Sequence, residues 1–212
     1  MKTLLQICLL MLVFFGSKDM AVYAETPPLN VKIDSGEIQG FLHEDRARAW
    51  LGVPYAAPPI GELRWRPPTL PLPWQAPRSA AEYGAQCAQP SWGQGDMKFA
   101  GSEDCLTLNI FAPKTSVDKP MPTMLWIHGG ANYLGRSNDY DGSYLASVHK
   151  VIVVTVNYRL GPFGWFHHPA ITQANQPATG QFALLDMIAA LQWVQRNIKA
   201  FGGNPKNVTI FG

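Results

Sequence analysis

The chain has 212 residues, 47% of them hydrophobic and 15% charged, and its formal net charge is +2. This length is sufficient for one domain with a substantial core, and the composition is that of a globular rather than a disordered protein. Because no strong positive field is available to hold phosphates, nucleic acid is excluded from the expected partners.

The N-terminus has the pattern of a secretory signal peptide, which we assign to residues 1–24. Lys2 provides a positive start, residues 4–15 are almost entirely apolar, and Ala24 ends a short segment suited to cleavage. The alternative is a membrane anchor, but the apolar run falls short of the roughly 20 residues that span a bilayer. We therefore expect a secreted or periplasmic protein with no stable membrane anchor, whose mature chain is a single domain over residues 25–212.

The first half of the mature chain carries only weak signals of regular structure. Residues 31–33 and 37–42 flank a Ser-Gly pair, which predicts an antiparallel hairpin, and residues 49–53 suit a third short strand. The proline-rich stretch 54–77 predicts an irregular surface loop, because proline fixes φ and removes a hydrogen-bond donor. Residues 78–104 show no clear periodicity, so we expect loop there as well.

Stronger signals begin after Cys105. Residues 106–111 alternate between apolar and polar, as in a half-buried strand, whereas residues 151–156 form a β-branched run typical of a strand buried on both faces. Short apolar runs at 124–127 and 208–211 predict two further strands, the second of them buried.

Residues 182–201 predict an amphipathic helix. Apolar residues recur at spacings of three and four, and two glycines followed by a proline mark the C-terminal end. The apolar stripe consists of Met187, Leu191, Val194, Ile198 and Phe201. Because this helix lies between two apolar strands, we expect a βαβ unit and an α/β domain with a mostly parallel central sheet.

The glycine that ends the last predicted strand bears on catalysis. In α/β-hydrolases the nucleophilic serine sits on a strand-to-helix turn of sequence G-x-S-x-G. Gly212 is placed to be the first glycine of that turn, so we expect the serine just after it and no catalytic residue within the chain. The nearest internal approximation, residues 135–139, lacks the second glycine, and we expect Ser137 to lie in a surface loop.

Five stretches, in order along the chain, resemble the type-B carboxylesterases, the family that includes cholinesterases and their non-catalytic adhesion relatives. They are LGVPYA at residues 51–56 with the proline-rich stretch after it, EDCLTLNI at 103–110, WIHGGA at 126–131, VNYRLG at 156–161, and FGG at 201–203 leading to Gly212. The similarity covers residues 29–212. It implies the N-terminal part of an α/β-hydrolase fold.

The resemblance also implies an oxyanion loop. The backbone N–H groups of Gly130 and Ala131 match the family's donors to the developing oxyanion, with His128 and Gly129 supporting the loop. Glycine suits this role because it leaves the backbone unobstructed. Since the family's catalytic base lies downstream of the serine, we expect His128 to be structural. Asn132 departs from the family, which usually has an aromatic residue there, and this change alters the expected wall of the acyl pocket.

Two cysteines of the mature chain, Cys87 and Cys105, form an even pair in an exported protein, which favours a disulfide over two unpaired thiols. They match the family's first disulfide. The resemblance further implies two structural ion pairs, Arg64 with Glu103 and Arg159 with Asp186. We expect no metal site and no cofactor.

The leading hypothesis is a carboxylic ester hydrolase that uses a serine and an acyl-enzyme intermediate, with a small-molecule ester as its partner. The chain would then carry the oxyanion loop but not the triad. One alternative is a non-catalytic, cholinesterase-like binding or adhesion protein. Another is an inactive truncated product, with an exposed sheet edge that promotes aggregation. The intact glycine motif favours the enzyme.

Overall fold

The computed structural model describes residues 27–92, 96–115, 117, 119–171 and 180–212. The expected signal peptide lies outside the described residues. Among the helices that are described, none has both the length and the apolar character needed to cross a membrane.

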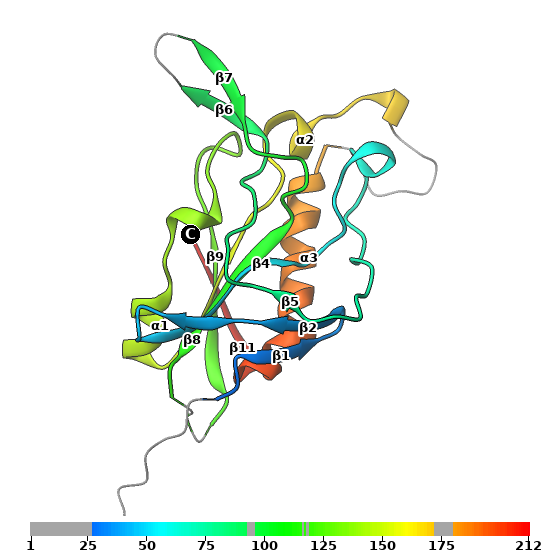
Figure 1. Cartoon of the computed structure of the whole chain (residues 1–212). Coiled ribbons are helices and arrows are strands. Elements are labelled where there is room, and N and C mark those ends of the chain that lie inside the picture. Colours follow the sequence, from blue (N-terminus) through cyan, green and yellow to red (C-terminus); the bar gives the residue numbers. More distant parts are fainter. Residues whose placement is uncertain (1–26, 93–95, 116, 118, 172–179) are drawn as a thin grey trace, which may run out of the picture.

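A six-stranded sheet forms the centre of the molecule (Figure 1). Its strands, in spatial order, are β11 (Gly203–Phe211), β9 (Met121–Ile127), β10 (Ile152–Val156), β8 (Thr107–Pro113), β4 (Ala47–Pro54) and β3 (Phe41–His43). The strands β11, β9 and β10 are parallel to one another, whereas β10–β8, β8–β4 and β4–β3 are antiparallel pairs.

The expected α/β class is therefore confirmed, but the expectation of a mostly parallel sheet is wrong for the described residues, where the sheet is mixed. Parallel pairing occurs where a helix intervenes between strands: α1 (Ser143–His149) between β9 and β10, then α2 (Gly161–Trp165) and α3 (Phe182–Asn197) between β10 and β11. A parallel pair needs such a crossover, whereas β3 and β4 are joined by a short turn and pair antiparallel.

The N-terminal hairpin is confirmed. Strands β1 (Asn30–Ile33) and β2 (Gly36–Gln39) pair antiparallel, and the short β5 (Arg78–Ser79) adds a parallel third strand. A separate two-stranded ribbon, β6 (Gln89–Trp92) with β7 (Met97–Ala100), was not expected from the sequence and projects from one end of the molecule (Figure 1).

The two faces of the sheet are covered by different helices. Alternate residues of β8 divide between them: Ile110 packs in the cluster that contains Trp193 of α3, whereas Phe111 packs with Ala146 of α1. Strand β8 is therefore buried on both faces rather than half-buried as predicted. The result is a layered α/β arrangement in which the carboxyl ends of β9, β10 and β11 lie at one edge of the sheet.

Helix α3 confirms the predicted helix, which ends in a 3₁₀ turn (Ile198–Phe201). Its buried face consists of Phe182, Ala183, Asp186, Ala190, Trp193, Val194 and Asn197. Met187 and Leu191 of the predicted stripe are only partly buried. The predicted buried face was therefore partly wrong. Two polar residues, Asp186 and Asn197, lie on the buried face, and a pattern of apolar residues cannot detect them.

Strand β11 is not the buried strand that the sequence predicted. Among the described residues it pairs only with β9, and Ile210 is 53% exposed. Its position at the edge of the described sheet accounts for that exposure.

Candidate active site

The segment directly after β9, residues 128–135, forms a tight loop. The Gly130 carbonyl accepts hydrogen bonds from the N–H groups of both Tyr133 and Leu134, each at 3.0 Å. Gly130 has φ +116°, and a Cβ at this position would lie 1.9 Å from the Leu134 oxygen. Only glycine fits such a turn.

Two residues of this loop carry side chains in a backbone conformation that L-residues rarely adopt. Ala131 has φ +54° and Asn132 has φ +61°. Left-handed backbone costs about 1–2 kcal/mol per non-glycine residue and is retained where the surrounding structure enforces it. Strain of this kind is typical of functional loops.

The N–H groups of Gly130 and Ala131 make no hydrogen bond to any group in the described part of the chain. Ala131 is exposed and Gly130 is partly exposed, so both donors are open to a ligand. Main-chain N–H groups in a left-handed turn form a concavity that binds anionic oxygen. The oxyanion role that the resemblance implies for this loop stays a prediction, with which this geometry agrees.

His128 is held at the start of the loop by Tyr158. The two rings stack with centroids 4.4 Å apart, and the Tyr158 hydroxyl donates a 2.6 Å hydrogen bond to the His128 carbonyl. The His128 Nδ1–H donates to the Gly129 carbonyl at 2.9 Å. Burial lowers the pKa of His128, because the imidazolium form would be desolvated. These contacts hold His128 as a stacked ring at the start of the loop, and its expected structural role stays a prediction.

Gly212 lies beside the first residues of the loop. Strand β11 runs parallel to β9, with Phe211 in register with Trp126. A Cβ at Gly212 would be only 2.3 Å from the Ile127 oxygen, one residue before His128. Gly212 therefore lies at the edge of the sheet where the loop begins.

The exit of the loop rests on a buried polar network that the sequence did not predict. The Ser137 N–H donates to Asn157 Oδ1 at 2.7 Å, and Asn109 Nδ2 donates to Ser137 Oγ at 3.1 Å. Ser137 is fully buried, so the expectation of a surface loop residue is wrong. The polar side chain of Asn157, directly after a run of apolar β-branched residues, was the available signal.

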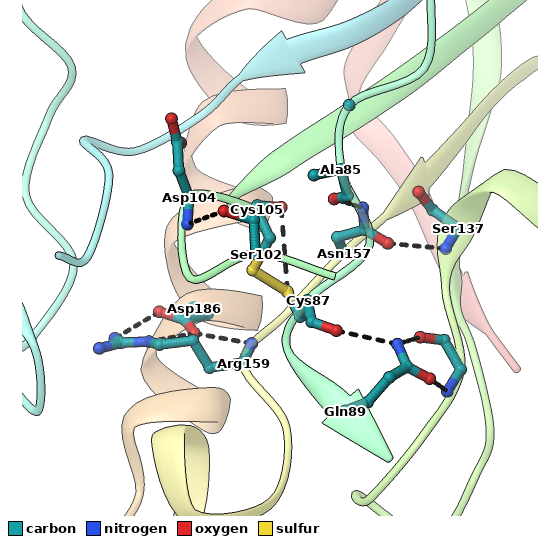
Figure 2. The surroundings of a disulfide bond; sticks show 12 residues. Ala85, Cys87, Gln89, Ser102, Asp104, Cys105, Ser137, Asn157, Arg159 and Asp186 are labelled. Carbon is teal, nitrogen blue, oxygen red and sulfur yellow. Dashed lines mark hydrogen bonds and ion pairs between the residues drawn. A yellow bond between two sulfur atoms is a disulfide. The ribbon is translucent and has the colours of Figure 1, made fainter. Parts of the chain in front are cut away.

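The disulfide between Cys87 and Cys105 is confirmed (Figure 2). Both cysteines are buried, and their Cα atoms are 5.0 Å apart. Cys105 immediately precedes the segment that enters β8, so the bridge ties an otherwise irregular segment to the central sheet.

The structure contains both expected ion pairs, in different surroundings. Arg159 donates to the two carboxylate oxygens of Asp186 at 2.8 and 2.7 Å, and Asp186 is fully buried. Arg64 also pairs bidentately with Glu103, but this pair lies at the surface. Because solvent screens the exposed pair, only Arg159–Asp186 has the buried, architectural character that we expected of both.

One cluster of possible metal ligands occurs in the described ranges, formed by His43, Glu44 and Asp141. Two of the three residues are exposed, and His43 Nε2 lies 3.0 Å from Asp141 Oδ2. Exposed acidic groups of this kind are common without an ion, and the cluster carries no chemistry that the site requires.

Comparison with known proteins identifies the family. The model of the family described as "Carboxylesterase family" matches residues 27–212. The chain belongs to the carboxylesterase family. The para-nitrobenzyl esterase of Bacillus subtilis (strain 168) is 46% identical over 186 residues, which are 84% of this chain and 36% of the relative. The fumonisin B1 esterase of Sphingopyxis macrogoltabida is 41% identical over 204 residues, covering 93% of this chain and 37% of the relative.

A solved structure of a carboxylesterase, described as a PNB esterase, superposes with a TM-score of 0.78 at 45% identity. The alignment covers 88% of this chain and 38% of that structure. This carboxylesterase chain thus spans just over a third of the length of the relatives that it matches.

A hollow of about 410 Å³ lies beside the loop of this carboxylesterase chain. Its lining consists of Ala131, Asn132, Tyr133, Gly161, Pro162, Trp165 and Phe166. The Gly161 N–H donates to the Asn132 carbonyl at 2.8 Å, which fixes the loop against the wall of the hollow. An apolar group bound next to Ala131 would therefore contact an aromatic surface.

Proposed function

We propose that the complete protein is a carboxylic ester hydrolase with a serine nucleophile two positions beyond Gly212. One relationship carries the proposal: β11 places Gly212 beside Ile127, next to a loop with two N–H groups that have no hydrogen-bond partner among the described residues. A nucleophile borne on the following turn would be close to both donors. Membership of the carboxylesterase family supports this arrangement.

In the proposed reaction, a histidine base outside this chain takes the serine hydroxyl proton as the serine oxygen attacks the ester carbonyl carbon and forms a tetrahedral intermediate, and it later gives that proton to the leaving alcohol. The N–H groups of Gly130 and Ala131 donate hydrogen bonds to the oxyanion, and each such donor is typically worth a factor of about 10²–10³ in rate. The alcohol leaves, and water then hydrolyses the acyl-enzyme. We assign no base within this chain, because His128 is stacked on Tyr158 and uses its Nδ1–H on Gly129.

The test is to assay the full-length protein with p-nitrophenyl esters of short and long acids. Hydrolysis is expected, together with its loss when the serine after Gly212 is replaced by alanine. A folded full-length protein that binds esters without hydrolysing them, or that has no hydroxyl or thiol residue at that position, would support the non-catalytic alternative.

We further propose that residues 1–24 are a signal peptide and that the mature protein is exported. The confirmed disulfide supports this, because disulfides persist in oxidising compartments. N-terminal sequencing of protein recovered from the periplasm or medium is expected to begin at Glu25. An intact N-terminus on protein confined to the cytoplasm would contradict the proposal.

A further inference from the structure

The side chain of Gln89 connects the disulfide-bearing segment to the end of the candidate oxyanion loop (Figure 2). Gln89 Oε1 accepts the Gly135 N–H at 2.8 Å, and Nε2 donates to the Gly135 carbonyl at 2.8 Å. The same Nε2 donates to the Cys87 carbonyl at 3.0 Å. Gln89 is only 8% exposed, and its amide thus satisfies both main-chain polar groups of one loop residue.

Gly135 in turn packs directly against the first residues of the loop. It has φ +116°, and a Cβ at this position would lie 2.4 Å from the Gly129 oxygen and 2.5 Å from His128 Nδ1. The two ends of the loop therefore touch, and neither can shift without the other. A residue that fixes Gly135 therefore also fixes Gly129. Because Gly130 and Ala131 follow Gly129 directly, their N–H groups are positioned as well.

The loop needs such a restraint because its middle is strained. Ala131 and Asn132 are consecutive L-residues in left-handed backbone, and this conformation persists only where neighbouring structure enforces it. In the part of the chain that is described, the main-chain hydrogen bonds within the loop both go to the Gly130 carbonyl. Gln89 supplies the restraint at the opposite end.

The disulfide holds in place the segment that carries Gln89. Cys87 is two residues away, is buried, and is cross-linked to Cys105 at the entrance to β8. The main chain around it is also paired, since the Ala88 N–H donates to the Ser102 carbonyl at 3.0 Å. The support for the loop thus comes from the central sheet by way of the disulfide.

We infer that Gln89 is a positioning residue, which holds the oxyanion loop in its catalytic conformation by joining Gly135 to the Cys87–Cys105 segment. The inference rests on the proposed ester hydrolase function. Gln89 touches no reacting atom; it acts through the placement of the Gly130 and Ala131 N–H groups.

The experiment uses the full-length enzyme and compares Gln89→Leu with Gln86→Ala. Gln86 is the matched control, because it is the same residue type in the same segment, but among the described residues its side chain makes one hydrogen bond, accepted from the exposed Arg136. Four quantities are measured: kcat and KM for p-nitrophenyl butyrate, the inhibition constant of a trifluoromethyl ketone that mimics the tetrahedral intermediate, and the melting temperature. Rates are normalised to active sites titrated with an organophosphate.

We expect Gln89→Leu to lower kcat and the affinity for the ketone by the same factor, about 10- to 100-fold, with KM changed less than threefold. Such a loss is typical of an interaction made only in the transition state. Gln86→Ala should behave as the wild type. If Gln89→Leu does not fold, the isosteric Gln89→Glu is measured instead; its carboxylate faces two carbonyl oxygens, so the same loss is expected.

The outcomes separate this inference from the proposed function. A wild-type enzyme that hydrolyses the ester, with Gln89 variants that lose melting temperature but keep kcat per active site, overturns the positioning role alone. A folded wild type without activity overturns the proposed function and the positioning role with it.

The double variant Cys87→Ala/Cys105→Ala should also weaken ketone binding, and adding Gln89→Leu should produce less than the product of the two effects. Fully multiplicative effects would contradict the link through the disulfide.

Discussion

The hydroxyl of Tyr158 donates a 2.6 Å hydrogen bond to the main-chain oxygen of His128, the first residue of the candidate oxyanion loop. Tyr158 follows β10, which lies beside β9 in the sheet. A residue after the carboxyl end of β10 thus fixes the loop that follows β9. The loop is held at its start by Tyr158 and at its end by Gln89, while its middle carries the N–H groups of Gly130 and Ala131.

Removing the Tyr158 hydroxyl tests the first of these restraints. Tyr158→Phe keeps the ring stacked on His128 but leaves a buried carbonyl without its donor, so the free energy of unfolding should fall by about 1–2 kcal/mol. Urea unfolding of the full-length protein measures the change. Tyr144→Phe is the control, since Tyr144 is 62% exposed, and it should be neutral. Equal stability of the two variants would show that the hydroxyl is dispensable.

The lowered pKa of His128 predicts a pH dependence of stability. Burial disfavours the imidazolium, so the folded protein binds this proton less readily than the unfolded chain, whose histidine has the ordinary pKa of 6.5. The contribution of His128 is therefore fully present above about pH 6.5. It decreases as the pH falls below that value toward the lowered pKa.

The measurement is the difference in unfolding free energy between the wild type and His128→Phe from pH 5 to pH 8. Phenylalanine keeps an aromatic ring against Tyr158 but does not titrate. The wild type should lose stability relative to the variant on acidification below about pH 6.5. A difference independent of pH would contradict the assigned neutral state.

The two ion pairs should respond differently to the loss of one partner. Asp186→Ala leaves Arg159 charged, buried and unpaired, which typically costs 3–5 kcal/mol, on the order of the stability of a small domain. Glu103→Ala removes the partner of a solvent-exposed Arg64, and the unfolding midpoint should hardly move. Equilibrium unfolding in urea compares the variants. A large effect at Glu103 would show that this surface pair is more than a solvated contact.

The disulfide closes a loop with a sequence separation of 18 residues. In the loop-entropy model this constrains the unfolded chain and stabilises the fold by about 3 kcal/mol. Replacing both cysteines by serine should lower the unfolding free energy by about that amount, and reductant should change the wild type but not the variant. A wild type that is indifferent to reductant would contradict the prediction.

The features that the sequence predicted well are those with local causes. The β-branched run at 151–156 became a buried strand, and the hairpin predicted around the Ser-Gly pair formed, with Asp34 and Ser35 in its turn and Gly36 as the first residue of β2. Strand order and direction were predicted less well, because pairing depends on crossovers that no single segment encodes. Gln89 was missed because its partner Gly135 is 46 residues away in the sequence. Asn157 and Ser137 were missed for the same reason, since their hydrogen bond joins residues 20 positions apart in the sequence.

Two adjacent glycines of the loop provide the most direct test of its geometry. Gly129 does not have a positive φ, and a Cβ at this position would meet no atom within 4 Å. Gly130 has φ +116°, and a Cβ there would overlap the Leu134 oxygen. Gly129→Ala should therefore change the unfolding free energy by less than about 1 kcal/mol, as expected for an unstrained site. Gly130→Ala should cost about 1–3 kcal/mol and open the turn that Tyr133 and Leu134 close. In the full-length enzyme the opened turn should also lower kcat at least 100-fold, because the adjacent donors would no longer face the oxyanion. Unfolding in urea and the hydrolysis of p-nitrophenyl acetate measure the two effects, and equal behaviour of the two variants would contradict the loop as described.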